Sequence, residues 1–293
     1  MESKAINHES SRARWQAYRR SPLSLLLRLA VTVSAAITVF VLIALVAYIL
    51  IKGIPNLRPS LFAWEYTSEN ASMLPAIINT ITMTVLSLLM AVPVGICSAI
   101  YLVEYAKRGN KLVSLVRITA ETLQGIPSIV YGLFGFLFLV VACKFGYSLL
   151  SGAITLAIMI LPLILRTTEE ALKAVPDLYR EGSFGLGAGR LRTVFRIVLP
   201  SAVPGILAGV ILAIGRIVGE TAALIYTSGT VAGVPDTLMG SGRTLAVHMY
   251  ALLSNGLYTE EAYATAVVLL VMVIGINALS GWLAKKVSAK QGE

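Results

Sequence analysis

Long apolar segments separated by short polar connections dominate the sequence. Each segment approaches or exceeds the length of about 17 to 25 residues that a tilted helix needs to cross the hydrocarbon of a bilayer. The first segment is also too long to be the apolar core of a cleaved signal peptide. The pattern predicts an all-α membrane protein with six transmembrane helices, over Leu25–Ile51, Leu74–Val103, Val116–Ala142, Leu149–Leu165, Val203–Thr227 and Ala262–Ala284.

Composition supports a membrane location. The chain has 293 residues, of which 57% are hydrophobic and only 13% are charged. Water-soluble domains contain about 25% charged residues, so this chain has too few to cover a soluble core. Cys97 and Cys143 lie within or at the end of predicted spans. Two such thiols form no disulfide framework or metal site, and we expect them to be packing residues.

The distribution of basic residues predicts the orientation of the chain. With the amino terminus in the cytoplasm, 19 of the 24 Lys and Arg residues lie on the cytoplasmic side and four lie outside. This asymmetry follows the positive-inside rule and predicts a multi-pass protein with both termini cytoplasmic. The net charge of +9 then reflects topology, and we expect no nucleic-acid partner. Arg12, Arg14, Arg19 and Arg20 are instead predicted to be attracted to anionic membrane lipid.

Two connections have patterns of their own. In residues 166–200 a helix is predicted to start at Asp177, after Pro176, and glycines at 182, 185, 187 and 189 interrupt it. A helical pattern resumes over Leu191–Val198, so two short helices joined at a glycine turn are expected. The outer segment 228–258 is rich in glycine and then apolar. It is either a re-entrant or interfacial piece or an ordinary surface loop.

Charged residues inside the predicted spans are candidates for function, because a charge costs several kcal/mol at membrane depth unless it is paired or hydrated. Arg216 and Glu220 are four residues apart in the fifth span, a spacing that places them on one helical face where they can pair. They either form a neutral ion pair or handle an oxyanion, for which arginine offers planar donors. Arg166 and Glu121 are candidates for the same pathway or residues at a helix end. His248 is expected to be a packing residue in its loop.

No pattern of an enzyme is found. The dipeptide Gly-Lys does not occur, so the chain has no phosphate-binding loop of the GxxxxGK[ST] form. There is also no HExxH motif, no cluster of metal ligands and no nucleophile elbow. We therefore expect a transport subunit without catalytic residues, cofactor or metal, and any ATP hydrolysis on a separate chain.

The connection 166–200 carries a known signature. It begins with Glu181, Gly182 and Ser183, continues with Gly187, and ends on Ile197-Val198-Leu199-Pro200. Its spacing is identical to that of the EAA signature of ABC importer permeases, which reads EAA, three residues, Gly, nine residues and IxLP. The departures are Gly182 and Ser183 in place of two alanines, and both are small. The resemblance implies a type I ABC importer permease fold in which this segment is a cytoplasmic coupling helix that docks into the ATPase subunit.

Three further stretches, over residues 121–132, 161–172 and 216–222, resemble the PstA family of phosphate permeases. This resemblance covers residues 70–285 and implies a permease domain there, after a first span and outer loop over 23–69. Basic tails over 1–22 and 286–293 flank these regions. The implied partners are a PstC-like second permease subunit in a heterodimer, two ATPase subunits and an extracytoplasmic phosphate-binding protein. Arg166, Arg216 and Glu220 match positions that act in phosphate passage in that family.

The expected function is therefore translocation of inorganic phosphate across the cytoplasmic (inner) membrane of a bacterium. An alternative is a permease for another small oxyanion, sulfate or molybdate. A passive channel or ion-coupled carrier would leave the EAA signature without a role. A membrane-bound regulatory protein that senses phosphate is a further alternative.

Overall fold

The computed structural model describes residues 22–107 and 109–289, which divide into two compact units at Lys52 and Gly53. The described part of the first unit is the helix α2 (Pro22–Gly53). Its 32 residues correspond to about 48 Å at 1.5 Å per residue, enough to cross a bilayer with some tilt. The predicted tails 1–22 and 286–293 lie largely outside the described residues, and the division at residue 70 stays a prediction.

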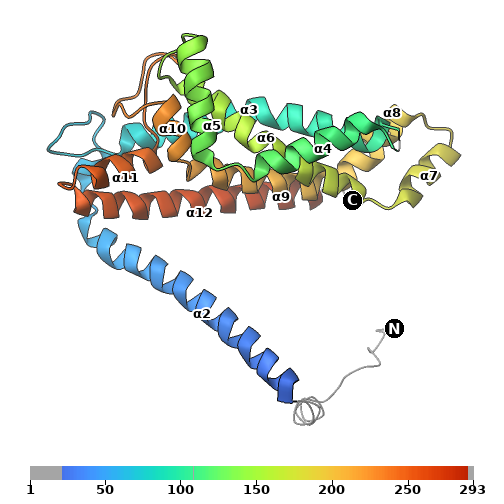
Figure 1. Cartoon of the computed structure of the whole chain (residues 1–293), viewed down its shortest axis with the longest axis horizontal. Helices are drawn as coiled ribbons and strands as arrows, with labels where there is room; N and C mark the ends of the chain where they lie inside the picture. The colour runs from blue at the N-terminus through green and yellow to red at the C-terminus, as the bar shows by residue number, and fades with distance from the viewer. Residues whose placement is uncertain (1–21, 108, 290–293) are drawn as a thin grey trace. The chain divides into compact units, whose positions relative to one another are not determined.

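All secondary-structure elements of the second unit are helices, within its described residues (Figure 1). The short helices α7 and α8 lie at one end of it, α11 lies at the other, and α9 and α12 run side by side between these ends. Its elements are η1 (Ile54–Asn56), η2 (Pro59–Phe62), α3 (Leu74–Ile100), η3 (Tyr101–Tyr105), α4 (Lys111–Gln124), α5 (Ser128–Gly135), η4 (Phe136–Ala142), α6 (Leu149–Lys173), α7 (Asp177–Gly185), α8 (Arg190–Thr193), η5 (Val194–Val198), α9 (Leu199–Val218), α10 (Ala222–Thr227), α11 (Leu245–Ser254) and α12 (Thr259–Ala289).

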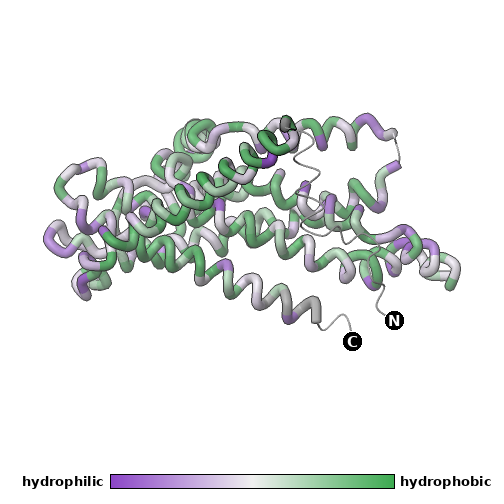
Figure 2. Tube along the Cα trace, turned by 90° about the horizontal axis from the view of Figure 1, so that it is seen from below, coloured by the Kyte–Doolittle hydropathy of each residue, from purple (hydrophilic) through white to green (hydrophobic). Residues whose placement is uncertain are grey.

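Membrane spans agree in number with the sequence analysis if one bent pair of helices counts as a single span. Hydrophobic residues run along the long helices (Figure 2). The all-α membrane fold class is therefore confirmed. Five continuous helices of the described residues are long and apolar enough to cross a membrane, namely Leu23–Asn56, Leu74–Tyr105, Leu149–Lys173, Arg190–Val218 and Thr259–Trp282.

The third predicted span, Val116–Ala142, is not one straight helix. The helices Lys111–Gln124 and Ser128–Ala142 meet at an angle of 103°. The break falls at Gly125-Ile126-Pro127, where Pro127 has extended backbone angles and caps the start of α5. Proline cannot donate a helical hydrogen bond and disfavours a helical residue before it, so the helix ends there. The prediction of a continuous span was wrong at this point.

The fifth predicted span, Val203–Thr227, is also interrupted. α9 ends at Val218 with Gly219 as its cap, and α10 starts at Ala222. The intervening residues belong to neither helix. Because a spacing of four residues places side chains on one face only within a continuous helix, the predicted common face of Arg216 and Glu220 does not form.

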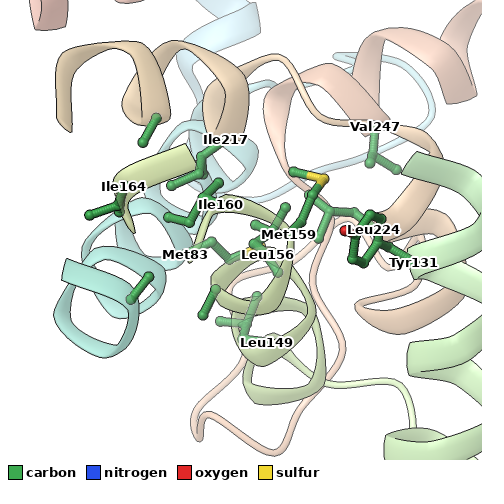
Figure 3. Close-up of a cluster of buried hydrophobic side chains, with 13 residues drawn as sticks. Met83, Tyr131, Leu149, Leu156, Met159, Ile160, Ile164, Ile217, Leu224 and Val247 are labelled. Atoms are coloured by element: carbon green, nitrogen blue, oxygen red, sulfur yellow. The ribbon is translucent and has the colours of Figure 1, made fainter. Parts of the chain in front are cut away.

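A core between α3, α6 and α9 holds the second unit together. Figure 3 shows Ile217 beside Ile160 and Ile164, with Met83 and Leu156 close by, and these five side chains are almost fully buried. Because lipid tails are as apolar as these side chains, close van der Waals packing stabilises this core.

Two glycines of α9 let it approach α6 closely. A Cβ atom at Gly205 would lie 2.7 Å from the Cβ of Ala171, and one at Gly209 would collide with the Thr167 side chain. These two glycines, four residues apart, therefore serve close helix packing. Gly215, further along α9, does not, because a Cβ atom there would meet nothing within 4 Å.

The segment 228–258 is not an ordinary surface loop. Leu245, Val247 and His248 of α11 are fully buried, and α11 packs against α12 and α3. The preceding strap, residues 228–244, accepts hydrogen bonds at Leu238 and Gly240 from the first N–H groups of α6. These groups have no partner within their own helix, so the strap caps α6.

Both cysteines are exposed on the surface of this chain. The expectation that Cys97 and Cys143 are packing residues is not met within this chain. Cys97 lies on a face of α3 that the rest of the chain leaves open, and Cys143 directly follows η4; side chains at membrane depth do not have to face the protein interior.

Candidate functional site

Arg216 is a cation near the end of α9 without a carboxylate partner among the described residues. Its side chain is partly buried. The antiparallel contacts of Gly205 with Ala171 and of Gly209 with Thr167 set the register of α9 against α6. The same register places Arg216 level with Ile160, within the long apolar span of α6. An unpaired guanidinium at this depth is available for an anion.

The charge of this arginine acts on the phenol group of Tyr131 in α5. The phenol hydroxyl donates a hydrogen bond of 2.7 Å to the carbonyl of Leu123, across the bend between α4 and α5. Figure 3 shows Tyr131 beside Leu224 of α10. A Cβ atom at Gly132 would lie 2.7 Å from the Cα of Ala223, so α5 and α10 are in near backbone contact. The two interrupted helices thus meet beside Arg216.

Glu220 lies in the break between α9 and α10 and is buried, with 9% of its surface exposed. Its Oε1 accepts a hydrogen bond of 3.0 Å from the N–H of Ala223 in the first turn of α10. The predicted ion pair with Arg216 does not form, because Gly219 ends α9 before the helix reaches Glu220. Glu220 therefore stabilises the start of α10, and Arg216 keeps its charge uncompensated.

Arg166 has different surroundings. Its guanidinium contacts Oε1 of Glu121 and Oε1 of Glu170, each at 3.2 Å. Glu169 beside it contacts Arg117 at 2.7 Å and Lys173 at 2.6 Å. All of these residues line a cavity of about 140 Å³. Arg166 thus belongs to a network of alternating charges that already compensates it.

The two arginines lie at different depths. Arg216 is level with Ile160 of α6, six residues before Arg166 on that helix. Six residues correspond to about 9 Å along a helix axis. The structure therefore does not bring Arg166, Arg216 and Glu220 into contact with one another. Arg166 lies on α6, Arg216 on α9, and Glu220 in the break after α9.

The predicted coupling segment forms two short helices joined at a glycine turn, as expected. Gly187 has a φ of +81°, in the left-handed region that favours glycine. The hydroxyl of Ser183 is buried and lies 2.8 Å from that of Thr193, which joins α7 to α8. Glu181 and Gly182 are exposed on α7. The exposed apolar side chains of Leu178, Tyr179, Phe184 and Leu186 are available to a partner.

The end of the signature connects this segment to α9. Val198 is fully buried, whereas Ile197, Leu199 and Pro200 on either side of it are partly buried. Pro200 is the second residue of α9, directly after the π-helical turn η5. The helix runs on through Pro200 into the span, whereas the sequence pattern indicated a helix over Leu191–Val198 and a separate span from Val203.

Sequence reasoning missed Arg180 and Glu104. The Arg180 side chain, 14% exposed, contacts Glu104 at 2.7 Å and Asp177 at 3.1 Å. It also donates to the carbonyls of Leu172 and Val175, at 2.9 and 2.8 Å. Arg180 thus fixes α7 to the ends of α3 and α6. The available signal was Glu104, a carboxylate directly after an apolar span.

Comparisons with known proteins identify relatives of this architecture. Residues 91–291 match the family described as binding-protein-dependent transport system inner membrane component. The probable ABC transporter permease protein YqgI of Bacillus subtilis is 32% identical over 279 residues, covering 87% of this chain and 93% of the relative. The phosphate transport system permease protein PstA of Pasteurella multocida is 35% identical over 230 residues, covering 77% and 81%. A chain in the crystal structure of a bacterial alginate ABC transporter, in complex with an alginate pentasaccharide-bound periplasmic protein, has the same fold, with a TM-score of 0.66, 16% identity and coverage of 94% and 98%.

Proposed function

Because this chain belongs to the family of binding-protein-dependent transport system inner membrane components, and is thus a permease subunit of an ABC importer, we propose that its cargo is inorganic phosphate. Relatives named as phosphate permeases, at 31 to 35% identity, support this cargo. The observation that carries the proposal is Arg216, a partly buried guanidinium in a span without a carboxylate partner among the described residues.

Arg216 is suited to a tetrahedral oxyanion in transit. Its planar guanidinium donates two parallel hydrogen bonds and stays charged at every physiological pH. The adjacent phenol of Tyr131 and the fixed carboxylate of Glu220 shape the surroundings of the guanidinium. A neighbouring carboxylate disfavours permanent retention of an anion, and release is as necessary as binding in a transport pathway. Arg166 provides a later contact, where phosphate competes with Glu121 and Glu170 for the guanidinium.

The proposed assembly places α7 in the cytoplasm, where it docks on an ATPase subunit. Glu181, Gly182 and the exposed apolar side chains of α7 form the docking face, and Gly187 ends it. Arg180 transmits movement of α7 to α3 and α6. The other components are a PstC-like permease, a second ATPase subunit and a phosphate-binding protein that delivers cargo at the α11 end. Both termini are then cytoplasmic.

The test is phosphate uptake by the assembled complex in reconstituted vesicles. Replacing Arg216 with Leu removes a charge-assisted contact worth about 1.5 to 3 kcal/mol, so uptake falls about 10- to 100-fold while the complex still assembles. The matched control is Arg58→Leu, which alters an exposed arginine whose carboxylate partner Glu260 is 3.6 Å away. We expect normal uptake in that variant.

Three results would contradict the proposal. Normal phosphate uptake by the Arg216→Leu variant would remove Arg216 from the pathway. Competition of labelled phosphate with sulfate and molybdate tests the cargo, and stronger transport of either competitor would make the chain a permease for that oxyanion. Uptake without ATPase subunits would identify a carrier or channel instead.

A further inference from the structure

A large basic cavity lies at the α7 end of the second unit, apart from Arg216. Its volume is about 1020 Å³, and it is lined by the loop before α4, the end of η3, and parts of α7 and α8. Two acidic side chains, Glu104 and Asp177, also line it. The six basic side chains in its lining are Lys107, Lys111, Arg117, Lys173, Arg180 and Arg190.

Ion pairs within the chain compensate only half of these cations. Arg180 contacts both carboxylates of the cavity, Glu104 and Asp177. Arg117 and Lys173 share the carboxylate of Glu169, which lies outside the cavity lining. Among the described residues, none of the other three cations forms an ion pair with a carboxylate.

Lys107, Lys111 and Arg190 are these three remaining cations. The guanidinium of Arg190 lies 5.6 Å from the centre of the Tyr105 ring, a contact that leaves its charge in place. Lys111 is also the first residue of α4, a helix of 14 residues, so the positive end of a helix dipole adds to the same region. The positive-inside rule accounts for the side of the membrane on which such residues lie, but it does not require them to surround one cavity.

The neighbouring surface of α4 is apolar. Leu112, Leu115 and Ile118 are 62%, 63% and 58% exposed, on the helix face next to the one that lines the cavity. A helix with one apolar exposed face and a basic edge is typical of the boundary between headgroups and acyl chains. An anion in this cavity would therefore have hydrocarbon beside it.

We propose that this cavity is a binding site for a phosphate-bearing anion, held by Lys107, Lys111 and Arg190. The apolar face of α4 favours the headgroup of an anionic phospholipid as the source of the phosphate, and free inorganic phosphate offers the same chemistry. Because Asp177, Arg180 and Phe184 of α7 line the same cavity, the bound anion stabilises the position of the coupling helix against α4.

The experiment measures anion binding to the detergent-purified complex that contains the full chain. Native mass spectrometry counts bound phosphatidylglycerol and, separately, phosphatidylcholine, and equilibrium dialysis measures inorganic phosphate. The test variant combines Lys107→Gln, Lys111→Gln and Arg190→Gln. Each surface cation contributes about 1 kcal/mol to anionic lipid binding, so we expect phosphatidylglycerol occupancy to fall about tenfold or more.

The control variant removes the same number of charges elsewhere, by Arg192→Gln, Arg196→Gln and Lys286→Gln. We expect it to retain phosphatidylglycerol. A third variant, with Lys107→Arg, Lys111→Arg and Arg190→Lys, keeps the charges and should bind normally, which shows that the site itself folds.

The lipid measurement and the phosphate measurement distinguish the two sources of the anion. Selective loss of phosphatidylglycerol by the test variant identifies lipid, and selective loss of inorganic phosphate identifies the free ion. Equal retention of both anions by the test and control variants would overturn the proposal. The Arg216→Leu variant should retain phosphatidylglycerol, so the lipid result is independent of the proposed transport pathway.

Discussion

Arg216 and Arg166 lie on neighbouring antiparallel helices, but their electrostatic surroundings differ. Arg166 contacts two carboxylates at 3.2 Å, and its side chain is 47% exposed. Arg216 is partly buried, has a phenol beside it and lacks a carboxylate partner among the described residues. A buried, uncompensated guanidinium is costly, whereas a compensated one at a helix end costs little.

The difference separates charges that support the fold from charges that act on a ligand. Arg180 is the clearest example of a charge that supports the fold, since its guanidinium donates to carboxylates and backbone carbonyls. Arg216 is the opposite case. Arg166 lies between them, because an anion reaches it only by displacing Glu121 or Glu170. Two variants test this ordering, and a third tests a buried group that stays neutral.

The largest effect on stability is expected when Arg180, whose guanidinium is fully hydrogen-bonded and ion-paired, loses its partner Glu104. Replacing Glu104 with Leu leaves the buried guanidinium of Arg180 partly uncompensated, and we expect the complex to lose about 3 kcal/mol of stability. Thermal unfolding in detergent measures this loss. Glu69→Leu, at an exposed carboxylate outside the proposed docking face, is the control and should change stability by less than about 0.5 kcal/mol. Unchanged stability of the Glu104→Leu variant would show that Arg180 does not depend on this pair.

The buried imidazole of His248, at the α11 end of the second unit, predicts how stability depends on pH. Burial and, as a smaller cause, the charge of Arg243 together lower the pKa of His248 from 6.5 to about 3, against the opposing effect of a backbone hydrogen bond with Ala71. The unfolded chain therefore binds a proton near pH 6.5 that the folded chain excludes until about pH 3. The resulting stability is complete above pH 6.5 and is lost as pH falls, by about 1.4 kcal/mol per pH unit.

Unfolding measured at pH 7.5, 6.5 and 5.5 checks this slope. The His248→Gln variant should lack the histidine contribution, so its stability should depend less on pH over this range. Parallel curves for the two proteins would mean that His248 is protonated in the folded state, or hydrated in a way that its burial does not indicate.

The smallest effect is expected at the compensated arginine. Replacing both Glu121 and Glu170 with Gln frees Arg166 for phosphate, and we expect slower release and a two- to fivefold lower uptake rate at saturating phosphate, on the order of 0.5 to 1 kcal/mol. Initial rates in reconstituted vesicles measure the change. An effect as large as that of Arg216→Leu would remove the distinction between the two arginines.

Much of the fold follows from local sequence signals. Apolar length located the spans, and Pro176 followed by the glycines up to Gly189 located α7 and the turn after it. The EAA spacing identified the same segment by resemblance. These signals are local because helix starts and glycine turns depend on a few neighbouring residues.

The remaining features depend on information that apolar length does not carry. The bend at Pro127 and the break at Gly219 lie within segments whose hydropathy is continuous. Both residues disfavour helix, and in retrospect they mark the interruptions. The contact of Arg180 with Glu104 joins residues 76 positions apart, and only the tertiary fold brings them together. The local spacing of Arg216 and Glu220 predicted an ion pair because the break was not anticipated.

The near backbone contact between Gly132 and Ala223 has a mechanical consequence. Helices this close cannot slide or separate without losing their packing, so α5 and α10 must move as one body. The chain is interrupted immediately before each of them, at Gly125–Pro127 and at Gly219–Thr221. Arg216 lies on α9 just before the second interruption, so any movement of α5 and α10 would change what faces its guanidinium.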